Sequence, residues 1–366
     1  MNTNNRTNEN RLIETLLGSK SEEVKFGVDV HAKELVASIQ EDGSLPQRGR
    51  RMSREQLLGV VKALRAAGKK VYVVQECGPC GYVLHRQLEA AGAVSYVVTA
   101  RDVTDGRRQK TDGLDAVALV NNLDRYLRGH RKAMTVIRVP SEEEEQARAQ
   151  SRLRDQLRES RQQWSSRGRS LLLAQGYHVS GEWWTPRAWR KLCAETALPD
   201  WLQEELDVMR TVLLEIDGQE KVRRKSLEKA APKELPKAIG ALSWVQLLRE
   251  MCTWKRFRNR RQVGGYTGLC AGVDQSGGRS RDGSINRYGN PRVRHLLIEM
   301  IWRLERWQPD YPPVRVLRES GARGAQRRKL AVAAARRLAI DLWRLATGQT
   351  TAQKLRLIVP ELEVSS

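Results

Sequence analysis

The first 140 residues show two hydrophobic patterns in turn. Short apolar runs of strand length predict buried or half-buried strands at 24–30, 34–40, 70–76 and 94–98. Apolar residues spaced three and four apart predict helices at 54–67, 81–91 and 112–127. Strands come first, and helices and strands then alternate. This order predicts an α/β domain whose mixed sheet is covered by helices.

A long polar segment with a different pattern begins after residue 140. Ser141 and Glu144 form a capping box, which marks the start of a helix. Large side chains then recur every seven positions, at Leu157, Trp164 and Leu171. A second long helix is expected at about 201–229, so the two helices could pair as an antiparallel coiled coil. The apolar seam is weak, because the intervening positions are polar or charged.

The last third of the chain combines a glycine-rich stretch with helices. Residues 264–289 are basic and rich in glycine, which predicts a loop region rather than a regular element. Asn290 and Pro291 then open a helix as N-cap and first-turn residue, and a last helix is expected at 325–346. The expected organisation is a mobile leader, an α/β domain, a helical linker and an α-helical C-terminal domain, at 1–20, 21–140, 141–234 and 235–366.

The charge balance indicates a polyanionic partner. Lys and Arg number 65 against 43 Asp and Glu, which gives a formal net charge of +22. Cationic side chains that neutralise phosphates release condensed counterions, so this excess favours nucleic-acid binding. The N-terminus has no signal-peptide pattern, no apolar run is long enough for a membrane span, and five irregularly spaced cysteines do not form a disulfide framework. These features predict a cytoplasmic protein with no membrane partner.

Four carboxylates occupy positions suited to a metal site. Asp29 lies in the first predicted strand, and Glu76 ends a later one. Asp112 and Asp115 are three apart at the start of a helix, so they share a face and repel each other. A divalent cation would offset this repulsion; Mg²⁺ suits oxygen ligands, and two-metal phosphoryl transfer needs acids on rigid elements. The structural alternative is that each acid only caps a helix or forms a turn.

Three stretches around these acids resemble a known family. GVDVHAKE, VVQECGPCGY and KTDGLDAVAL are similar to the DEDD motifs of insertion-sequence transposases related to the pilin-gene invertase Piv and, more distantly, to the RuvC Holliday-junction resolvase. The resemblance implies a ribonuclease-H-like (RuvC-like) fold for 21–140. It also implies that four residues are catalytic ligands of Mg²⁺: Asp29, Glu76, Asp112 and Asp115.

The glycine-rich segment carries the second half of this resemblance. GGYTGLCAGVDQSGGRSRDGSINRYGNPRVRHLL (264–297) is similar to the C-terminal signature of the same family. The resemblance implies that Ser276 becomes covalently joined to a DNA phosphate, with Ser280 and Ser284 as local alternatives. Ala271 stands where members often have proline, and 239–245 matches the usual upstream hairpin poorly. Nearby arginines are expected to bind nucleic acid: Arg279, Arg281, Arg287, Arg292 and Arg294.

Members of this family act with a structured non-coding RNA, the bridge RNA, which pairs with donor and target DNA. The chain is therefore expected to be an RNA-guided DNA recombinase or transposase that exchanges strands between the two DNAs. The resemblance further implies a homo-oligomer, a dimer or tetramer, with an active site composed from two subunits. Two alternatives stay open: a metal-only RuvC-like junction-resolving nuclease, and a non-catalytic nucleic-acid-binding protein.

Other reactive or aromatic residues have more ordinary explanations. The segment Cys77–Cys80 matches a thioredoxin redox tetrapeptide, but no other part of such a domain accompanies it. His31 either contacts the acidic site or the substrate, or is structural. Three tryptophans could stack on bases, although packing in a core is the preferred interpretation: Trp183, Trp184 and Trp189.

Overall fold

The computed structural model describes the backbone of residues 3–99, 112–276 and 279–359, and the side chains of these residues except 3–9 and 273–283. Two compact units make up the chain, Met1–Val139 and Pro140–Ser366. The division falls beside the domain boundary expected after residue 140. Among the described helices, none is long and apolar enough to cross a membrane.

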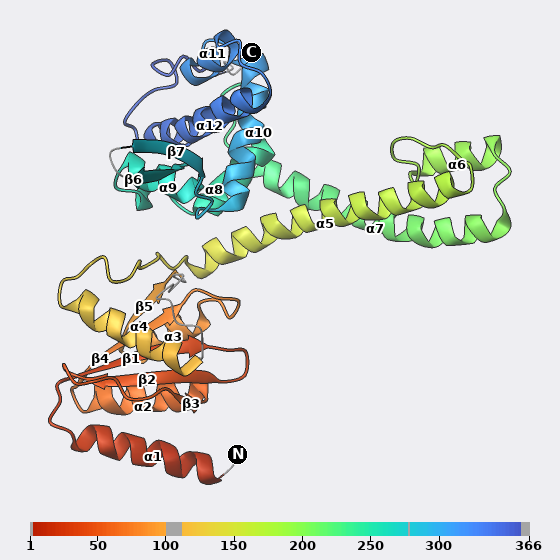
Figure 1. Ribbon diagram of the computed structural model, residues 1–366. Coiled ribbons are helices and arrows are strands. Elements are labelled where there is room, and N and C mark those ends of the chain that lie inside the picture. Colours follow the sequence, from red (N-terminus) through yellow and green to blue (C-terminus); the bar gives the residue numbers. More distant parts are fainter. Residues whose placement is uncertain (1–2, 100–111, 277–278, 360–366) are drawn as a thin grey trace, which may run out of the picture. The chain divides into compact units, whose positions relative to one another are not determined.

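A five-stranded mixed sheet forms the centre of the first unit (Figure 1). Its strands are β1 (Glu23–Val30), β2 (Leu35–Glu41), β3 (Arg50–Met52), β4 (Lys70–Glu76) and β5 (Val94–Val98), in the order β3-β2-β1-β4-β5. The pairs β1–β2 and β2–β3 are antiparallel, and β1–β4 and β4–β5 are parallel. The four predicted strands and the mixed sheet are confirmed. Strand β3 was missed, because three residues are too few to show a period.

Helices cover both faces of this sheet. Helices α2 (Arg54–Ala66) and α3 (Val83–Ala90) share a hydrophobic core with Val73 of β4. Helix α4 (Asp112–Leu127) packs instead with Val74, the next residue of the same strand. Because successive side chains of a strand point to opposite faces, α4 lies on the face opposite α2 and α3. The predicted helices are confirmed to within a few residues.

Helix α1 (Thr3–Gly18) occupies most of the segment expected to be a mobile leader. Leu12 and Leu16 lie four apart on one face, are 8% and 0% exposed, and belong to the same core as Leu57 of α2. The segment thus has a helix with two buried side chains, a feature that the expected leader did not include. Leu12 and Leu16 hold the helix on α2. Two leucines in an otherwise polar segment are too few to predict such packing from the sequence.

Two long helices begin the second unit. Helices α5 (Glu142–Ala174) and α7 (Asp200–Lys229) run antiparallel along each other (Figure 1), and the capping box at Ser141 is present. Ion pairs hold the middle of their interface: Arg154 Nη2 lies 2.9 Å from Glu220 Oε1, and Arg161 Nη1 lies 3.1 Å from Asp217 Oδ1. The weak apolar seam seen in the sequence is therefore interrupted by ion pairs in its middle.

An aromatic cluster closes the far end of the helix pair, near α6 (Pro186–Glu195). Trp183, Trp184 and Trp189 are 2%, 1% and 8% exposed and pack with Leu172 of α5 and Leu206 of α7. Packing in a core is thus confirmed for these tryptophans.

The remaining helices enclose a separate core. They are α8 (Ala241–Met251), the 3-10 turn η1 (Trp254–Arg256), α9 (Arg260–Thr267), α10 (Pro291–Trp307), α11 (Pro312–Glu319) and α12 (Gly324–Ala346). Between α9 and α10 lies a hairpin of β6 (Ala271–Ser276) and β7 (Arg279–Ile285). The prediction of an irregular loop at 264–289 is therefore wrong. Backbone pairing builds the hairpin, and glycine-rich strands show little side-chain alternation.

Buried Glu250 fastens α5 to this helical part. Its side chain is 3% exposed; Arg152 of α5 donates to both carboxylate oxygens at 2.8 Å, and Asn290 Nδ2 donates at 2.9 Å. Burial alone would raise the pKa of Glu250, but these hydrogen bonds and the nearby arginine charges lower it below 4.5. Asn290 also caps α10, as predicted, so one carboxylate connects three helices.

Candidate active site

Two of the four predicted acids lie at the same edge of the sheet. Strands β1 and β4 run parallel with Val28 opposite Gln75, the residues that precede Asp29 and Glu76. Both acids therefore lie at the carboxyl ends of neighbouring strands. This is the edge at which open sheets of this kind commonly carry functional groups.

The other two acids come from the first turn of α4, which approaches β1 unusually closely. A Cβ at Gly27 would lie 2.3 Å from the Ala116 carbonyl oxygen and 2.5 Å from the Val120 nitrogen. A Cβ at Gly49 would lie 2.8 Å from Gly113 Cα. Glycine at these positions lets α4 pack directly on the backbone of the sheet. The acids in its first turn are thereby brought to the edge of the sheet.

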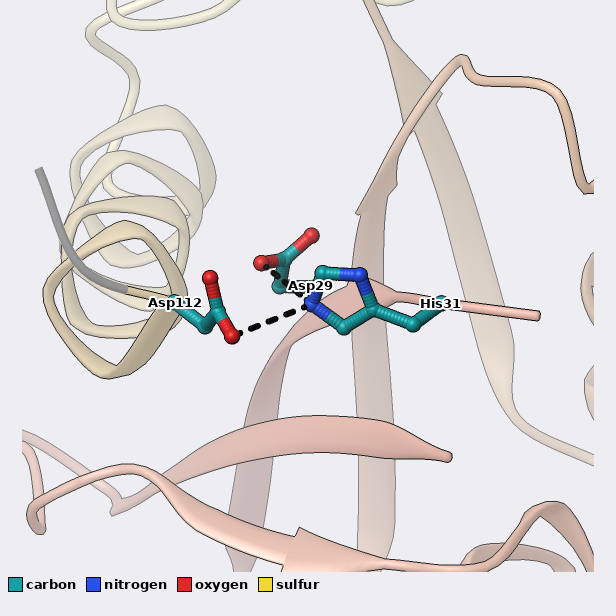
Figure 2. Close-up of side chains that lie close together, drawn as sticks. All are labelled: Asp29, His31 and Asp112. Atoms are coloured by element: carbon teal, nitrogen blue, oxygen red, sulfur yellow. Dashed lines mark ion pairs between the residues drawn. The ribbon is translucent and has the colours of Figure 1, made fainter. Parts of the chain in front are cut away.

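Asp29 and Asp112 meet through the imidazole of His31 (Figure 2). His31 Nε2 lies 3.2 Å from Asp29 Oδ2 and 3.4 Å from Asp112 Oδ2. One ligand atom from each of the three residues falls within 4.8 Å of the other two. Of the two interpretations of His31, contact with the acidic site is therefore confirmed. The site faces solvent, since the Asp112 side chain is 52% exposed.

The electrostatics of this cluster favour a cation. Burial raises the pKa of Asp29, and the negative charges of Asp112 and Asp115 raise it further, while His31 acts in the opposite direction. Burial and neighbouring negative charges both disfavour the ionised form of Asp29, and a bound cation would offset both effects. Carboxylate oxygens with one imidazole nitrogen form a donor set that accepts divalent metal ions, including Mg²⁺ and Mn²⁺. The residues present therefore fit such an ion.

Glu76 and Asp115 line a small cavity together. A cavity of about 30 Å³ lies between the ends of β4 and β5 and helix α4, and its walls include Thr99, Asn122 and Thr135. The first turn of α4 thus supplies Asp112 to the His31 cluster and Asp115 to this cavity. The four acids predicted from the sequence are all close to one end of α4.

A cationic pocket adjoins this cavity and was missed in the sequence. It is lined by Arg125, His130, Arg131 and Lys132 at the far end of α4, and Ala133 belongs to the walls of both spaces. No acidic residue is among its lining residues. The sequence feature that could have indicated this pocket is the basic run from His130 to Lys132, which follows the end of the helix predicted at 112–127.

Ser276 is the last residue of β6, where its backbone pairs with Arg279 beside the turn of the hairpin. The side chains of Ser276, Arg279 and Arg281 lie outside the described residues. Two other predicted arginines have partners within the unit: Arg292 Nη1 lies 2.6 Å from Asp155 Oδ2, and Arg294 Nη1 donates to the Thr267 carbonyl at 3.2 Å. Arg287 is exposed, so it is the described member of the predicted set best placed to meet a ligand.

The two cysteines of the redox-like tetrapeptide are free thiols with different neighbours. Cys77 Sγ lies 3.6 Å from the Tyr82 hydroxyl, and Cys80 Sγ lies 3.7 Å from the Val30 carbonyl. This arrangement gives no support to a redox role.

Comparison with known proteins finds a family match in each half of the chain. Residues 26–176 match the DEDD-type transposase family of IS110, and residues 236–312 match the family described as Transposase IS116/IS110/IS902. The chain is similar to "Putative transposase y4rJ" of Sinorhizobium fredii (strain NBRC 101917 / NGR234), with 32% identity over 74% of this chain and 76% of the relative. It is also similar to "Putative transposase y4qE" of the same organism, with 29% identity over 69% of this chain and 62% of that relative. The chain therefore belongs to the IS116/IS110/IS902 family of insertion-sequence transposases.

Proposed function

We propose that this transposase is an RNA-guided DNA recombinase, which exchanges strands between donor and target DNA through a bond between Ser276 and a DNA phosphate. The observation that carries the proposal is the convergence of Asp29 and Asp112 on His31. Asp115, from the same turn of α4, shares a cavity with Glu76. Acids grouped in this way on a strand edge and a helix suit phosphoryl transfer.

Asp29, Glu76, Asp112 and Asp115 are the residues that would hold Mg²⁺. When bound, the ion supplies Lewis acidity at the scissile phosphate. The protein's part is to hold the acids on β1, β4 and α4, whose close packing fixes their spacing. The strand order β3-β2-β1-β4-β5, with acids at the carboxyl ends of two parallel strands, supports a ribonuclease-H-like, RuvC-like interpretation of the first unit.

The proposed covalent step is a transesterification. The Ser276 oxygen forms a bond to the phosphorus, the bond from that phosphorus to a sugar oxygen breaks, and the serine proton ends on the released sugar hydroxyl. A hydroxyl of the other DNA then attacks the serine ester and restores the serine. The phosphodiester energy is conserved in the protein–DNA ester, so strands are rejoined without ATP. The place of Ser276 beside a hairpin turn supports access to DNA.

The proposed partners are donor DNA, target DNA and a bridge RNA, and the proposed active form is a homo-oligomer, a dimer or tetramer, in the cytoplasm. The net charge of +22 supports binding of several nucleic-acid strands. A native preparation is expected to contain a discrete RNA encoded beside the gene. Recovery of only random host RNA would contradict guidance.

The decisive experiment traps the covalent intermediate. The purified protein, with the RNA encoded beside its gene, is incubated with labelled donor and target DNA and Mg²⁺, and is then denatured and digested to locate the modified peptide. The wild type is expected to give recombinants and a denaturation-resistant adduct, and Ser276→Ala is expected to give neither. Ser280→Ala and Ser284→Ala are matched controls that should retain both products.

A metal-only nuclease is the rival function, and the same assay separates it. If Ser276→Ala still cuts DNA in Mg²⁺ and no adduct forms with the wild type, the serine mechanism is wrong and junction resolution replaces it. Asp29→Asn should abolish cutting under either mechanism. Full activity of this variant, or activity in excess chelator, would contradict the metal site.

A further inference from the structure

The turn between β7 and α10 presents an exposed aromatic ring. The side chain of Tyr288 is 88% exposed, which among the large hydrophobic side chains of the described residues is matched only by Leu45 at 89%. Arg287 beside it is exposed as well and has a positive φ of 59°, a conformation that is uncommon outside glycine. Local strain of this kind persists only when the surrounding structure fixes the backbone.

The backbone around Tyr288 is firmly attached to the domain. The nitrogen atoms of Asn286, Arg287 and Asn290 donate to the carbonyls of Cys270, Gly268 and Tyr266 at 2.9, 3.3 and 2.8 Å. A Cβ at Gly289 would lie 2.1 Å from the Gly268 nitrogen, so the turn sits directly on the end of α9. The exposed ring is therefore held on a fixed base rather than on a loose loop.

Exposure of this kind does not contribute to folding. A tyrosine stabilises a core by burying its ring, and Tyr288 buries almost none of it. A flat, exposed ring beside an exposed arginine matches what nucleic-acid-binding proteins use for unpaired bases: the ring stacks on the base, and the guanidinium meets the phosphate.

We propose that Tyr288 is a stacking site for an unpaired base of the DNA substrate. The hairpin gives the spacing: Ala271 pairs with Ile285 at the end near Tyr288, and Ser276 pairs with Arg279 at the other end. The five-residue separation along β6 corresponds to about 17 Å at 3.3 Å per residue. Stacked nucleotides advance about 3.4 Å each, so a strand of this length places the base several nucleotides from the phosphate that Ser276 attacks. This spacing rests on the function proposed for Ser276, whereas the stacking itself does not.

The test uses the full-length protein and DNA oligonucleotides with 2-aminopurine at successive unpaired positions, because stacking on an aromatic ring quenches this base. The wild type, Tyr288→Phe and Tyr288→Trp are expected to quench the probe most strongly at one position, several nucleotides from the cleavage position. Tyr288→Ala should lose the quench and bind this DNA about 5- to 150-fold more weakly, the range measured for loss of one stacked base. Leu45→Ala is the matched control, equally exposed but aliphatic, and should change neither quench nor affinity.

Each contrary result has a definite meaning. Unchanged quenching by Tyr288→Ala would overturn the stacking site. A loss of quenching in Tyr288→Phe as large as in Tyr288→Ala would overturn it as well, and would point to the phenol hydroxyl instead. If Tyr288→Ala loses the quenching of 2-aminopurine placed in RNA but not of 2-aminopurine placed in DNA, the ligand is RNA and the proposal for DNA is refuted. Thermal unfolding of Tyr288→Ala should match the wild type, and a lowered melting temperature would indicate a structural role. Measuring the quench in Ser276→Ala separates the two proposals, since stacking should persist there even if the serine mechanism fails.

Discussion

Replacing Gly27 by alanine is expected to separate helix α4 from strand β1 and to displace Asp112 and Asp115. The new methyl group would lie 2.3 Å from the Ala116 carbonyl oxygen and 2.5 Å from the Val120 nitrogen. Both are backbone atoms of a regular helix, so neither can rotate away as a flexible side chain could. The helix as a whole must shift.

The size of the effect follows from these distances. Ordinary van der Waals contact begins at 3.4 Å, so α4 must retreat by about 1 Å. Overpacking of a closely packed interior costs about 1–3 kcal/mol, and this is the expected loss in the unfolding free energy of the first unit. A displacement of about 1 Å at a catalytic group lowers a rate by roughly 100-fold. DNA strand cleavage should therefore fall by about two orders of magnitude, which corresponds to about 2.7 kcal/mol of activation free energy.

The assay pairs urea unfolding with Mg²⁺-dependent DNA cleavage, both on the full-length protein. Gly218→Ala is the control: Gly218 lies inside helix α7, and a Cβ added there would meet none of the described atoms of other segments within 4 Å. That change should leave cleavage unaffected and raise stability by up to about 1 kcal/mol. If Gly27→Ala keeps wild-type stability and cleavage, the close approach of α4 to β1 does not position the acids.

Three further predictions concern other parts of the molecule. Asp124→Ala removes the carboxylate 2.8 Å from the buried Lys25 ammonium, which keeps Glu23 at 3.9 Å and the Asp42 carbonyl as partners. The change should destabilise the first unit by about 1.5–3 kcal/mol, measured by urea unfolding, and a loss below about 1 kcal/mol would contradict this. The pKa of Glu250 is lowered in the folded state, so its stabilising effect is complete above the unfolded value of 4.5 and is lost as pH falls through the folded value. Glu250→Gln should therefore flatten the acid side of the pH–stability curve of the second unit, and an unchanged curve would contradict it. Arg131→Ala in the cationic pocket should weaken DNA binding evenly across sequences and reduce the salt slope by about one, whereas an unchanged slope would exclude a phosphate contact there.

Much of the fold is predictable from the sequence, because the signals are local. Strand β4 is visible as a short apolar run and helix α4 as a helical segment, and Ser141 and Asn290 cap their helices as expected. The hairpin of β6 and β7 was not predicted, since its pairing uses backbone groups that every residue carries. The anchoring of helix α1 was missed for a related reason, because two leucines decide it and their partner helix lies far along the chain.

The order of the elements, the basic charge, and the candidacy of the four acids and the serine for chemistry are all visible along the chain. How these residues are used depends on contacts between segments that are distant in the sequence. Gly27 reads as an ordinary glycine in a strand, yet its missing side chain lets α4 carry two acids to the sheet edge. Arg292 reads as one more basic residue, yet Asp155 of another helix engages it. Tyr288 reads as one aromatic among many, and only its exposure on an anchored turn singles it out. Burial, close approach and pairing depend on residues distant in the chain, and no local pattern encodes them.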